Sequence, residues 1–333
     1  MERQKLIIDT DCGSDDAMAI AMAMHDANYE VLFFSTVAGN VSCEQAVVNT
    51  LTTLEKAGTY EPPVYPGCKL PLVTPLYYAH ETHGNDGMGD LGTLKEPTLK
   101  IEKMHAVDAI IKIVREGDGE IEIVALGTLT KVALAIVKAP EVMKKVPCIT
   151  IMGGAAFEGN SNPLAEYNIW QDAEAADILF ASGIPVVMAA IEACHDESEF
   201  SAQDLEYLRT CGSKLATFCV DINRGLIACD EAYFGKFFLD RAHRLTDQIV
   251  GVQRLGPGLV AQRRFGVGEQ RDAGDVEFHG AFGIAHALID AEAIHARHRG
   301  NRCAQIVAVN DEQRPDQVVG GQHVFTDQPA RPF

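Results

Sequence analysis

The sequence predicts an α/β fold with a mainly parallel, mixed sheet, helices on both faces and a Rossmann-like core. Short apolar runs alternate with longer stretches of helix-favouring residues, and glycine-rich loops follow several of the apolar runs. The runs are apolar throughout, as expected for parallel strands buried on both faces. The predicted strands are 6–8, 30–35, 121–126, 148–152 and 184–188, and the predicted helices are 17–24, 43–57, 104–115 and 173–181.

The first predicted strand leads directly into an acidic turn. Asp9, Asp11, Asp15 and Asp16 fall within eight residues, and Gly13 lets the backbone bend before the helix. Ligands of α/β sheets bind at the carboxyl ends of strands, and oxygen ligands at this density favour Ca²⁺ or Mg²⁺ over zinc. In the alternative reading, Asp15 and Asp16 only stabilise the helix N-terminus while Asp9 faces solvent.

Three further loops follow predicted strands and are expected to meet the acidic turn on one rim of the sheet. They comprise residues 37–41, 126–130 and 152–155, and each contains glycine. The rim is therefore the expected place for a site.

Composition limits the classes of partner. The net charge of −19 argues against a nucleic-acid surface, because phosphate binding needs clustered Lys and Arg. No apolar signal segment or membrane span is recognisable, and nine cysteines without a CxxC pair fit a reducing compartment. We expect a cytoplasmic protein that binds a small, neutral molecule and neither nucleic acid nor membrane.

One domain is expected over residues 1–333, with an atypical segment from about residue 241. Up to Asp240 the chain has thirteen Lys and four Arg, whereas from Arg241 onward it has no Lys and eleven Arg. This shift has no physical explanation in the sequence.

The acidic turn, residues 9–17, resembles the signature of the nucleoside hydrolases, the inosine-uridine-preferring N-ribohydrolase family. Other blocks resemble the family in the same order along residues 6–195. They are residues 36–41, 83–87, 126–130 and 152–155, then Asn160, residues 165–168 and residues 172–176. The resemblance implies the nucleoside hydrolase fold, Ca²⁺-dependent hydrolysis of ribonucleosides to ribose and a free base, and a homodimer or homotetramer.

The resemblance also implies a set of metal ligands. Asp11, Asp16, Asp247 and the backbone carbonyl of Leu126 would bind Ca²⁺. Asp11 would in addition take a proton from a water that the metal polarises. This is reasonable chemistry in itself, because a divalent cation lowers the pKa of bound water and a neighbouring carboxylate can complete the deprotonation.

The same resemblance implies a set of residues around the ribose. Carboxylates accept hydrogen bonds and amides both donate and accept, so such groups can pair every hydroxyl of a buried sugar. Taken alone, Glu166 and Asn168 would share one face of a strand or lie in a solvated loop, and Asn40 could be an ordinary turn residue. The implied ribose residues are Asp15, Asn40, Met152, Asn160, Glu166, Asn168 and Asp247.

The residue that protonates the leaving base is not where the family places it. The segment that best matches the family's last block has Thr246 where a His is expected. A threonine hydroxyl is far too weak an acid for this role near neutral pH. His83 is the catalytic candidate in its place. The alternatives are His243 in the same segment, or a preference for leaving groups that need little protonation.

Two other functions remain open from the sequence. One is a nucleoside- or ribose-binding pseudoenzyme whose catalysis is impaired at Thr246. The other is a Mg²⁺-dependent phosphohydrolase in which Asp9 is a covalent nucleophile, although a phosphate site would not need the extra Asp15 and Asp16.

Overall fold

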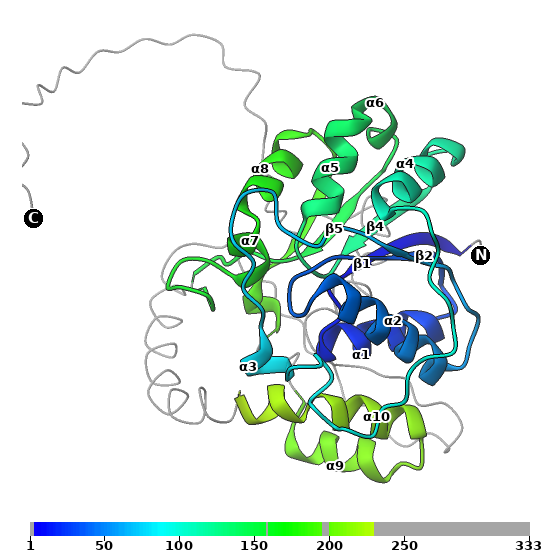
Figure 1. Ribbon diagram of the computed structural model, residues 1–333, viewed down its shortest axis with the longest axis vertical. Coiled ribbons are helices and arrows are strands. Elements are labelled where there is room, and N and C mark those ends of the chain that lie inside the picture. The colour runs from blue at the N-terminus through cyan, green and yellow to red at the C-terminus, as the bar shows by residue number, and fades with distance from the viewer. Residues whose placement is uncertain (1–2, 158, 195–199, 230–333) are drawn as a thin grey trace, which may run out of the picture.

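A computed structural model describes residues 3–157, 159–194 and 200–229 (Figure 1). Thr246, Asp247, His243 and the atypical segment from about 241 lie outside the described residues. The described strands are β1 (Gln4–Thr10), β2 (Tyr29–Thr36), β3 (Val64–Pro66), β4 (Ile121–Ala125), β5 (Ile149–Met152) and β6 (Val186–Ala189). The helices are α1 (Ser14–His25), α2 (Cys43–Ala57), α3 (His80–His83), α4 (Ala106–Glu116), α5 (Thr130–Lys138), α6 (Pro140–Met143), α7 (Tyr167–Gln171), α8 (Ala173–Ala181), the 3₁₀ helix η1 (Ile191–Cys194), α9 (Ala202–Thr210) and α10 (Lys214–Ile222).

The sheet is doubly wound and confirms the predicted α/β class. Its strand order is β3-β2-β1-β4-β5-β6, and every strand pair among the described residues is parallel, so the expected mixed character is absent from the described sheet. The chain winds outward from β1 through β2 to β3 and then crosses to β4 on the other side of β1. The strand order therefore reverses between β1 and β4, which is where such sheets bind ligands.

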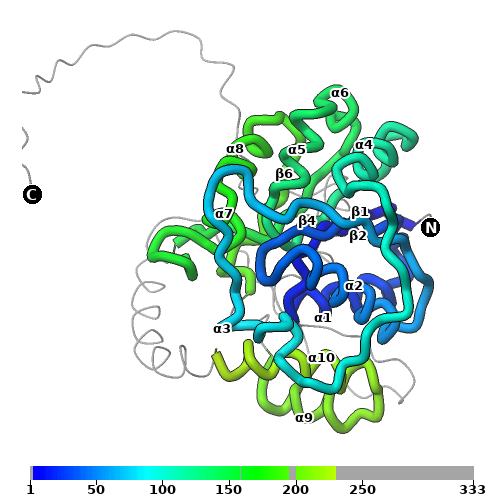
Figure 2. Tube along the Cα trace, viewed as in Figure 1, coloured from blue at the N-terminus to red at the C-terminus, as the bar shows by residue number. Residues whose placement is uncertain are grey.

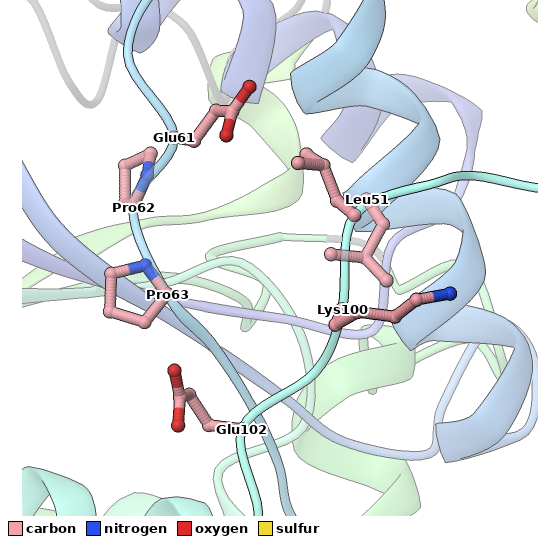
Figure 3. Close-up of a pocket in the computed structure, with 7 residues that line it drawn as sticks. Leu51, Glu61, Pro62, Pro63, Lys100 and Glu102 are labelled. Carbon is pink, nitrogen blue, oxygen red and sulfur yellow. The ribbon is translucent and has the colours of Figure 1, made fainter.

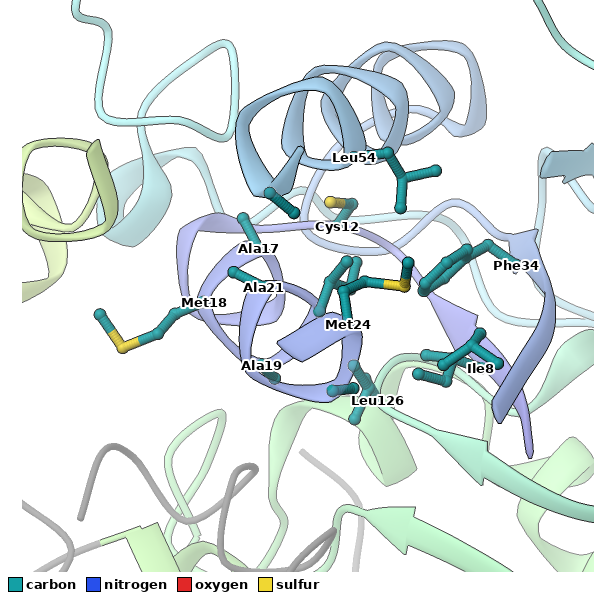
Figure 4. Close-up of a cluster of buried hydrophobic side chains, with 14 of the residues drawn as sticks. Ile8, Cys12, Ala17, Met18, Ala19, Ala21, Met24, Phe34, Leu54 and Leu126 are labelled. Carbon is teal, nitrogen blue, oxygen red and sulfur yellow. The ribbon is translucent and has the colours of Figure 1, made fainter. Parts of the chain in front are cut away.

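Each face of the sheet has its own apolar core. Leu6, Ile8 and Phe34 pack against α1, α2 and α10, a cluster that also includes Cys12 and Leu126 (Figure 4). Ile7 and Phe33 point to the opposite face and pack with α4, α5 and α8. Successive residues of a strand alternate between faces, so the uninterrupted apolar runs supply both cores.

The long connection between β3 and α4 brings a remote segment to the rim (Figure 2). It contacts α7, where Gln171 accepts a hydrogen bond from the Tyr77 N–H at 2.8 Å. Farther on, Arg224, just after α10, donates to the carbonyl of Gly89. α3 lies next to the N-terminus of α1, because His83 Nδ1 is 3.0 Å from Ser14 Oγ.

Helix ends follow local capping signals. Ser42 accepts the Gln45 N–H at the start of α2, and Gly58 ends that helix with φ of 64°. Asp172 caps α8 by accepting the Ala175 N–H. Within the described residues, no helix is long and apolar enough to cross a membrane.

Candidate active site

The acidic turn is held by hydrogen bonds among its own residues. Thr10 Oγ1 accepts the Cys12 N–H at 2.9 Å and donates to Asp16 Oδ1 at 2.8 Å. Asp16 Oδ2 accepts the Gly13 N–H at 2.9 Å. Cys12 has φ of 31°, a conformation unfavourable for a residue with a side chain, so these bonds are needed to hold the turn.

The carboxylate of Asp11 lies between two backbone segments that approach it closely. A Cβ atom on Gly39 would lie 2.0 Å from Oδ2, and one on Gly127 would lie 2.4 Å from Oδ1. Oδ2 accepts the Asn40 N–H at 2.7 Å, whereas Oδ1 is buried and has no hydrogen-bond partner in the described structure. The glycines after β2 and β4 thus leave room for this carboxylate at the point where the strand order reverses.

Burial makes the carboxyl groups of Asp11 and Asp16 difficult to ionise. Burial raises the pKa of Asp11 to about 6, against a smaller lowering effect of the Asn40 N–H. Burial also raises the pKa of Asp16 well above its usual range, and the charges of Asp11 and Asp15 raise it further. Asn40 Nδ2 donates to Asp16 Oδ2 at 3.2 Å and so bonds to both carboxylates. A bound cation or a proton would relieve this repulsion.

Asp9 is buried, which corrects the alternative in which it faces solvent. Its Oδ1 accepts Lys131 Nζ at 3.0 Å, and its Oδ2 accepts Ser35 Oγ at 2.9 Å. Burial raises the pKa of the Asp9 carboxyl, and the Lys131 ammonium acts in the opposite direction. A fully buried carboxylate with partners on both oxygens is not placed to attack a phosphate as the phosphohydrolase reading requires.

His83 reaches the turn from the last position of α3. Its side chain is buried, and Nδ1 lies 3.0 Å from Ser14 Oγ and 3.7 Å from Asp15 Oδ1. A Cβ on Gly13 would lie 3.1 Å from the same nitrogen. The structure therefore places this candidate catalytic residue beside the acidic turn.

Glu166 caps a short helix and Asn168 lies in its first turn, and both are buried, which corrects the reading of a shared strand face or a solvated loop. Glu166 is the N-cap of α7 and accepts the N–H groups of Asn168 and Gly154. Asn168 Nδ2 donates to the carbonyls of Leu126 and Met152 at 2.9 and 3.1 Å. Both side chains are buried at the ends of β4 and β5.

The remaining predicted ribose residues differ in exposure. Met152 is buried at the end of β5, and its sulfur accepts a hydrogen bond from Asn168 Nδ2 at 3.3 Å. Asn160 is exposed, and its Oδ1 accepts the Tyr167 N–H at 2.8 Å, one residue after Glu166. Asn160 thus lies near the rim without contacting the acidic turn.

The described residues supply part of a cation site. Across residues 3–157, 159–194 and 200–229, no group of three or more His, Cys, Asp or Glu side chains could hold a metal ion. Asp11 and Asp16 offer carboxylate oxygens, and the predicted further ligand Asp247 lies outside the described residues. The buried, unpartnered oxygen of Asp11 and the all-oxygen donor set fit a hard cation such as Ca²⁺.

Sequence reasoning missed two buried residues that hold the site together. Lys131 is the ion-pair partner of Asp9, although the two residues lie 122 positions apart. Asn49 donates to the carbonyls of Cys12 and Asp86, both at 2.9 Å, and so joins the turn to the loop after α3. The only signal for Lys131 in the sequence was a charged residue within the apolar stretch after Thr130, and this signal did not identify Asp9 as its partner.

A surface hollow elsewhere contains no predicted site residue (Figure 3). Glu61, Lys100 and Glu102 are exposed, so none of its charged side chains is a buried group that could hold a ligand. The hollow is lined by Leu51, Glu61, Pro62, Pro63, Leu99, Lys100 and Glu102.

Comparison with known proteins decides the family. A family model described as inosine-uridine preferring nucleoside hydrolase matches residues 6–315. The chain belongs to this family. It is an enzyme of the nucleoside hydrolase type, which confirms the resemblance in the sequence.

Individual relatives support the assignment. The chain is 37% identical over 217 residues to the pyrimidine-specific ribonucleoside hydrolase RihA of Enterobacter sp. (strain 638), covering 65% of this chain and 69% of the relative. It is 41% identical over 224 residues to probable uridine nucleosidase 1 of Oryza sativa subsp. japonica, covering 67% and 68%. A solved plant nucleoside hydrolase, PpNRh1, is 38% identical with a TM-score of 0.67, covering 70% of this chain and 74% of that one.

Proposed function

We propose that the protein hydrolyses the N-glycosidic bond of ribonucleosides to ribose and a free purine or pyrimidine base, with Asp11 as general base and Ca²⁺ as cofactor. The observation that best supports this proposal is the Asp11 carboxylate, buried where the strand order reverses, with Oδ1 lacking a hydrogen-bond partner. Family membership supports the reaction class. The residues around Asp11 support its role.

The turn is suited to taking a proton from water. In the cation-free protein burial raises the pKa of Asp11 to about 6, so this carboxylate is a stronger base than an exposed aspartate. When bound by Asp11, Asp16 and the Leu126 carbonyl, Ca²⁺ would offset the repulsion between the carboxylates and lower the pKa of water. Asn40 keeps Asp11 oriented through the hydrogen bond from its backbone N–H.

The polar groups near α7 are suited to a sugar. The Glu166 carboxylate accepts backbone N–H groups, and a carboxylate has about four acceptor positions, so it can also accept ribose hydroxyls. Breaking a glycosidic bond develops positive charge on the ribose, and Glu166 and Asp15 would stabilise that charge. Asn168 is held in place by the Leu126 and Met152 carbonyls.

His83 is proposed to protonate the leaving base. Its Nδ1 is engaged by Ser14, which leaves Nε2 as the ring nitrogen for a substrate. This assigns to α3 the role that Thr246 cannot perform. A nucleoside-binding pseudoenzyme remains the alternative, because Thr246 and Asp247 lie outside the described residues.

The test is release of reducing sugar from uridine, cytidine and inosine, before and after removal of Ca²⁺ with EDTA. Uridine comes first, because two curated relatives are named for pyrimidine nucleosides or uridine. We expect turnover to stop on chelation and to return with Ca²⁺. Asp11→Asn should lower kcat by about 100-fold to 10,000-fold.

Asp118→Asn is the matched control, because Asp118 is exposed in the loop between α4 and β4, outside the site. This variant should have the same kcat as the wild type. Nucleoside binding without release of sugar would favour the pseudoenzyme. Hydrolysis of a phosphate ester without nucleoside hydrolysis would favour the phosphohydrolase.

We further propose that the enzyme acts in the cytoplasm as a homodimer or homotetramer. The oligomer is implied by the family resemblance, and the cytoplasmic location by the reduced cysteines expected from the sequence. Light scattering coupled to size-exclusion chromatography measures the oligomer directly. A monomeric mass would contradict this part of the proposal.

A further inference from the structure

A fully buried ion pair holds the first carboxylate of the acidic turn. Lys131 on α5 and Asp9 on β1 are both 0% exposed, and Lys131 Nζ lies 3.0 Å from Asp9 Oδ1. Ser35 Oγ donates to the other oxygen at 2.9 Å. Removing two charges from water is unfavourable unless their geometry and hydrogen bonds are good, so such a pair needs a reason.

The surrounding backbone is shaped to admit this lysine. A Cβ on Gly67 would lie 2.1 Å from Lys131 Cδ, so the glycine after β3 leaves room for the lysine stem. Lys131 enters from α5, whereas Asp9 and Ser35 face each other on β1 and β2. Three separate elements therefore cooperate to place one ammonium group against one carboxylate.

Asp9 is also tied to the candidate cation site through the backbone. Its carbonyl accepts the Leu126 N–H at 2.7 Å, and Leu126 is followed by Gly127, which lies against Asp11 Oδ1. Asp11 itself is two residues farther along the chain. The charge of Asp9 is thus located next to the carboxylates that would hold Ca²⁺.

The pair divides the four carboxylates into two groups. Asp9 has an ammonium partner, whereas no described Lys or Arg lies within ion-pair distance of Asp11 or Asp16. We propose that Lys131 is a positioning residue of the cation site, which fixes Asp9 and cancels its charge so that Asp11, Asp15 and Asp16 set the charge that the cation meets. This inference rests on the proposed function, because it assumes that the acidic turn binds Ca²⁺.

The proposal predicts different effects for the two halves of the pair. Lys131→Met removes a cation next to the site without adding a positive charge, so it should bind Ca²⁺ at least as tightly as the wild type. Asp9→Asn leaves the Lys131 charge uncompensated and should weaken Ca²⁺ binding by about tenfold or more. The double variant Asp9→Asn/Lys131→Met removes both charges and should bind Ca²⁺ within about threefold of the wild type.

Ca²⁺ dissociation constants would be measured by competition with a chelating dye, which requires no turnover. A purely structural pair predicts weaker Ca²⁺ binding in both single variants and in the double variant, alongside their lower Tm. The exposed pair Lys138–Asp108 on α5 and α4 supplies the matched control. Lys138→Met and Asp108→Asn should leave the Ca²⁺ dissociation constant unchanged.

The outcomes separate the two proposals. Ca²⁺ binding by the wild type that is lost in Asp11→Asn supports the site, and changes of the same sign in both single variants would then overturn only the role of Lys131. Absence of Ca²⁺ binding by the wild type would overturn the cofactor and this inference together. If Lys131→Met does not fold, weaker binding in Asp9→Asn together with recovery in the double variant still supports the inference, and failure of the double variant to recover overturns it.

Discussion

At Asp11, the burial that leaves one carboxylate oxygen without a hydrogen-bond partner also raises the carboxyl pKa to about 6. A side chain placed only for stability would not be left in this state, because an unpartnered buried polar group is unfavourable. In the proposed role of Asp11, a bound cation or a transferred proton would give this oxygen a partner. In the cation-free protein, the ionised Asp11 carboxylate should therefore lower the free energy of unfolding by a measurable amount.

The pH dependence of stability tests that penalty. The folded-state pKa of Asp11 lies above its ordinary value of 3.8, so its contribution to stability is fully present below about pH 4 and is lost as pH rises through about 6. In EDTA, Asp11→Asn should therefore exceed the wild type in stability by about 3 kcal/mol near neutral pH, and the difference should shrink toward about pH 4. Thermal unfolding of both proteins across this range measures it. A difference independent of pH would contradict the assignment.

At the scale of elements, α2 acts as a brace between two parts of the site. Asn49 on this helix donates to the Cys12 carbonyl in the strained turn and to the Asp86 carbonyl in the loop after His83. Its Oδ1 accepts Gln45 Nε2 at 2.9 Å, so the amide is engaged on both sides. The relative placement of Asp11 and His83 thus depends on a residue that touches neither.

Substitution of this brace should affect stability and catalysis together. Asn49→Ala leaves two carbonyls without their donor and should lower the free energy of unfolding by about 2–3 kcal/mol. It should also lower kcat, because the turn and the His83 loop lose their common support. Thr53→Val is the matched control, since the Thr53 hydroxyl bonds only to the Asn49 carbonyl within α2. Urea unfolding with steady-state kinetics tests both effects, and equal losses in the two variants would contradict a bracing role.

The elements differ in how far the sequence could predict them. Strands such as β4 and helix α8 follow from apolar runs and capping residues, and α8 begins and ends where the pattern predicts. The acidic turn was recognisable because its carboxylates are close together in the sequence. α7 was misread, because a five-residue helix capped by Glu166 has too few residues to show a helical period.

Long-range pairs were beyond the sequence for a different reason. Lys131 and Asp9 meet only because α5 packs under β1, and Asn49 reaches the turn only because α2 lies over it. Neither the Lys131–Asp9 contact nor the Asn49–Cys12 contact produces a periodic pattern in the sequence. The sequence therefore predicted that the loops after β2 and β4 meet the acidic turn at one rim, while the contacts that position the side chains there required the structure.

At the scale of the whole molecule, the doubly wound order gathers the site from separate parts of the chain. β1 supplies the acidic turn, the segment after β4 supplies Leu126 and Gly127, and the segment after β2 supplies Asn40. Because a ligand at the reversal of strand order contacts both halves of the sheet, its binding is linked to the folding of both. The site and the stability of the fold should therefore respond to the same cation.

Ca²⁺ should stabilise the entire described fold. A ligand that binds only the folded state adds about 2.7 kcal/mol to the free energy of unfolding at 100 times its dissociation constant. We expect Tm to rise with Ca²⁺ concentration in the wild type and in Asp118→Asn, and to stay constant in Asp11→Asn. Mg²⁺ should stabilise less, because it demands a stricter octahedral geometry and sheds water reluctantly. A wild-type Tm that changes neither with EDTA nor with added Ca²⁺ would show that the acidic turn does not bind this cation. The buried charges of Asp11 and Asp16 would then need another partner.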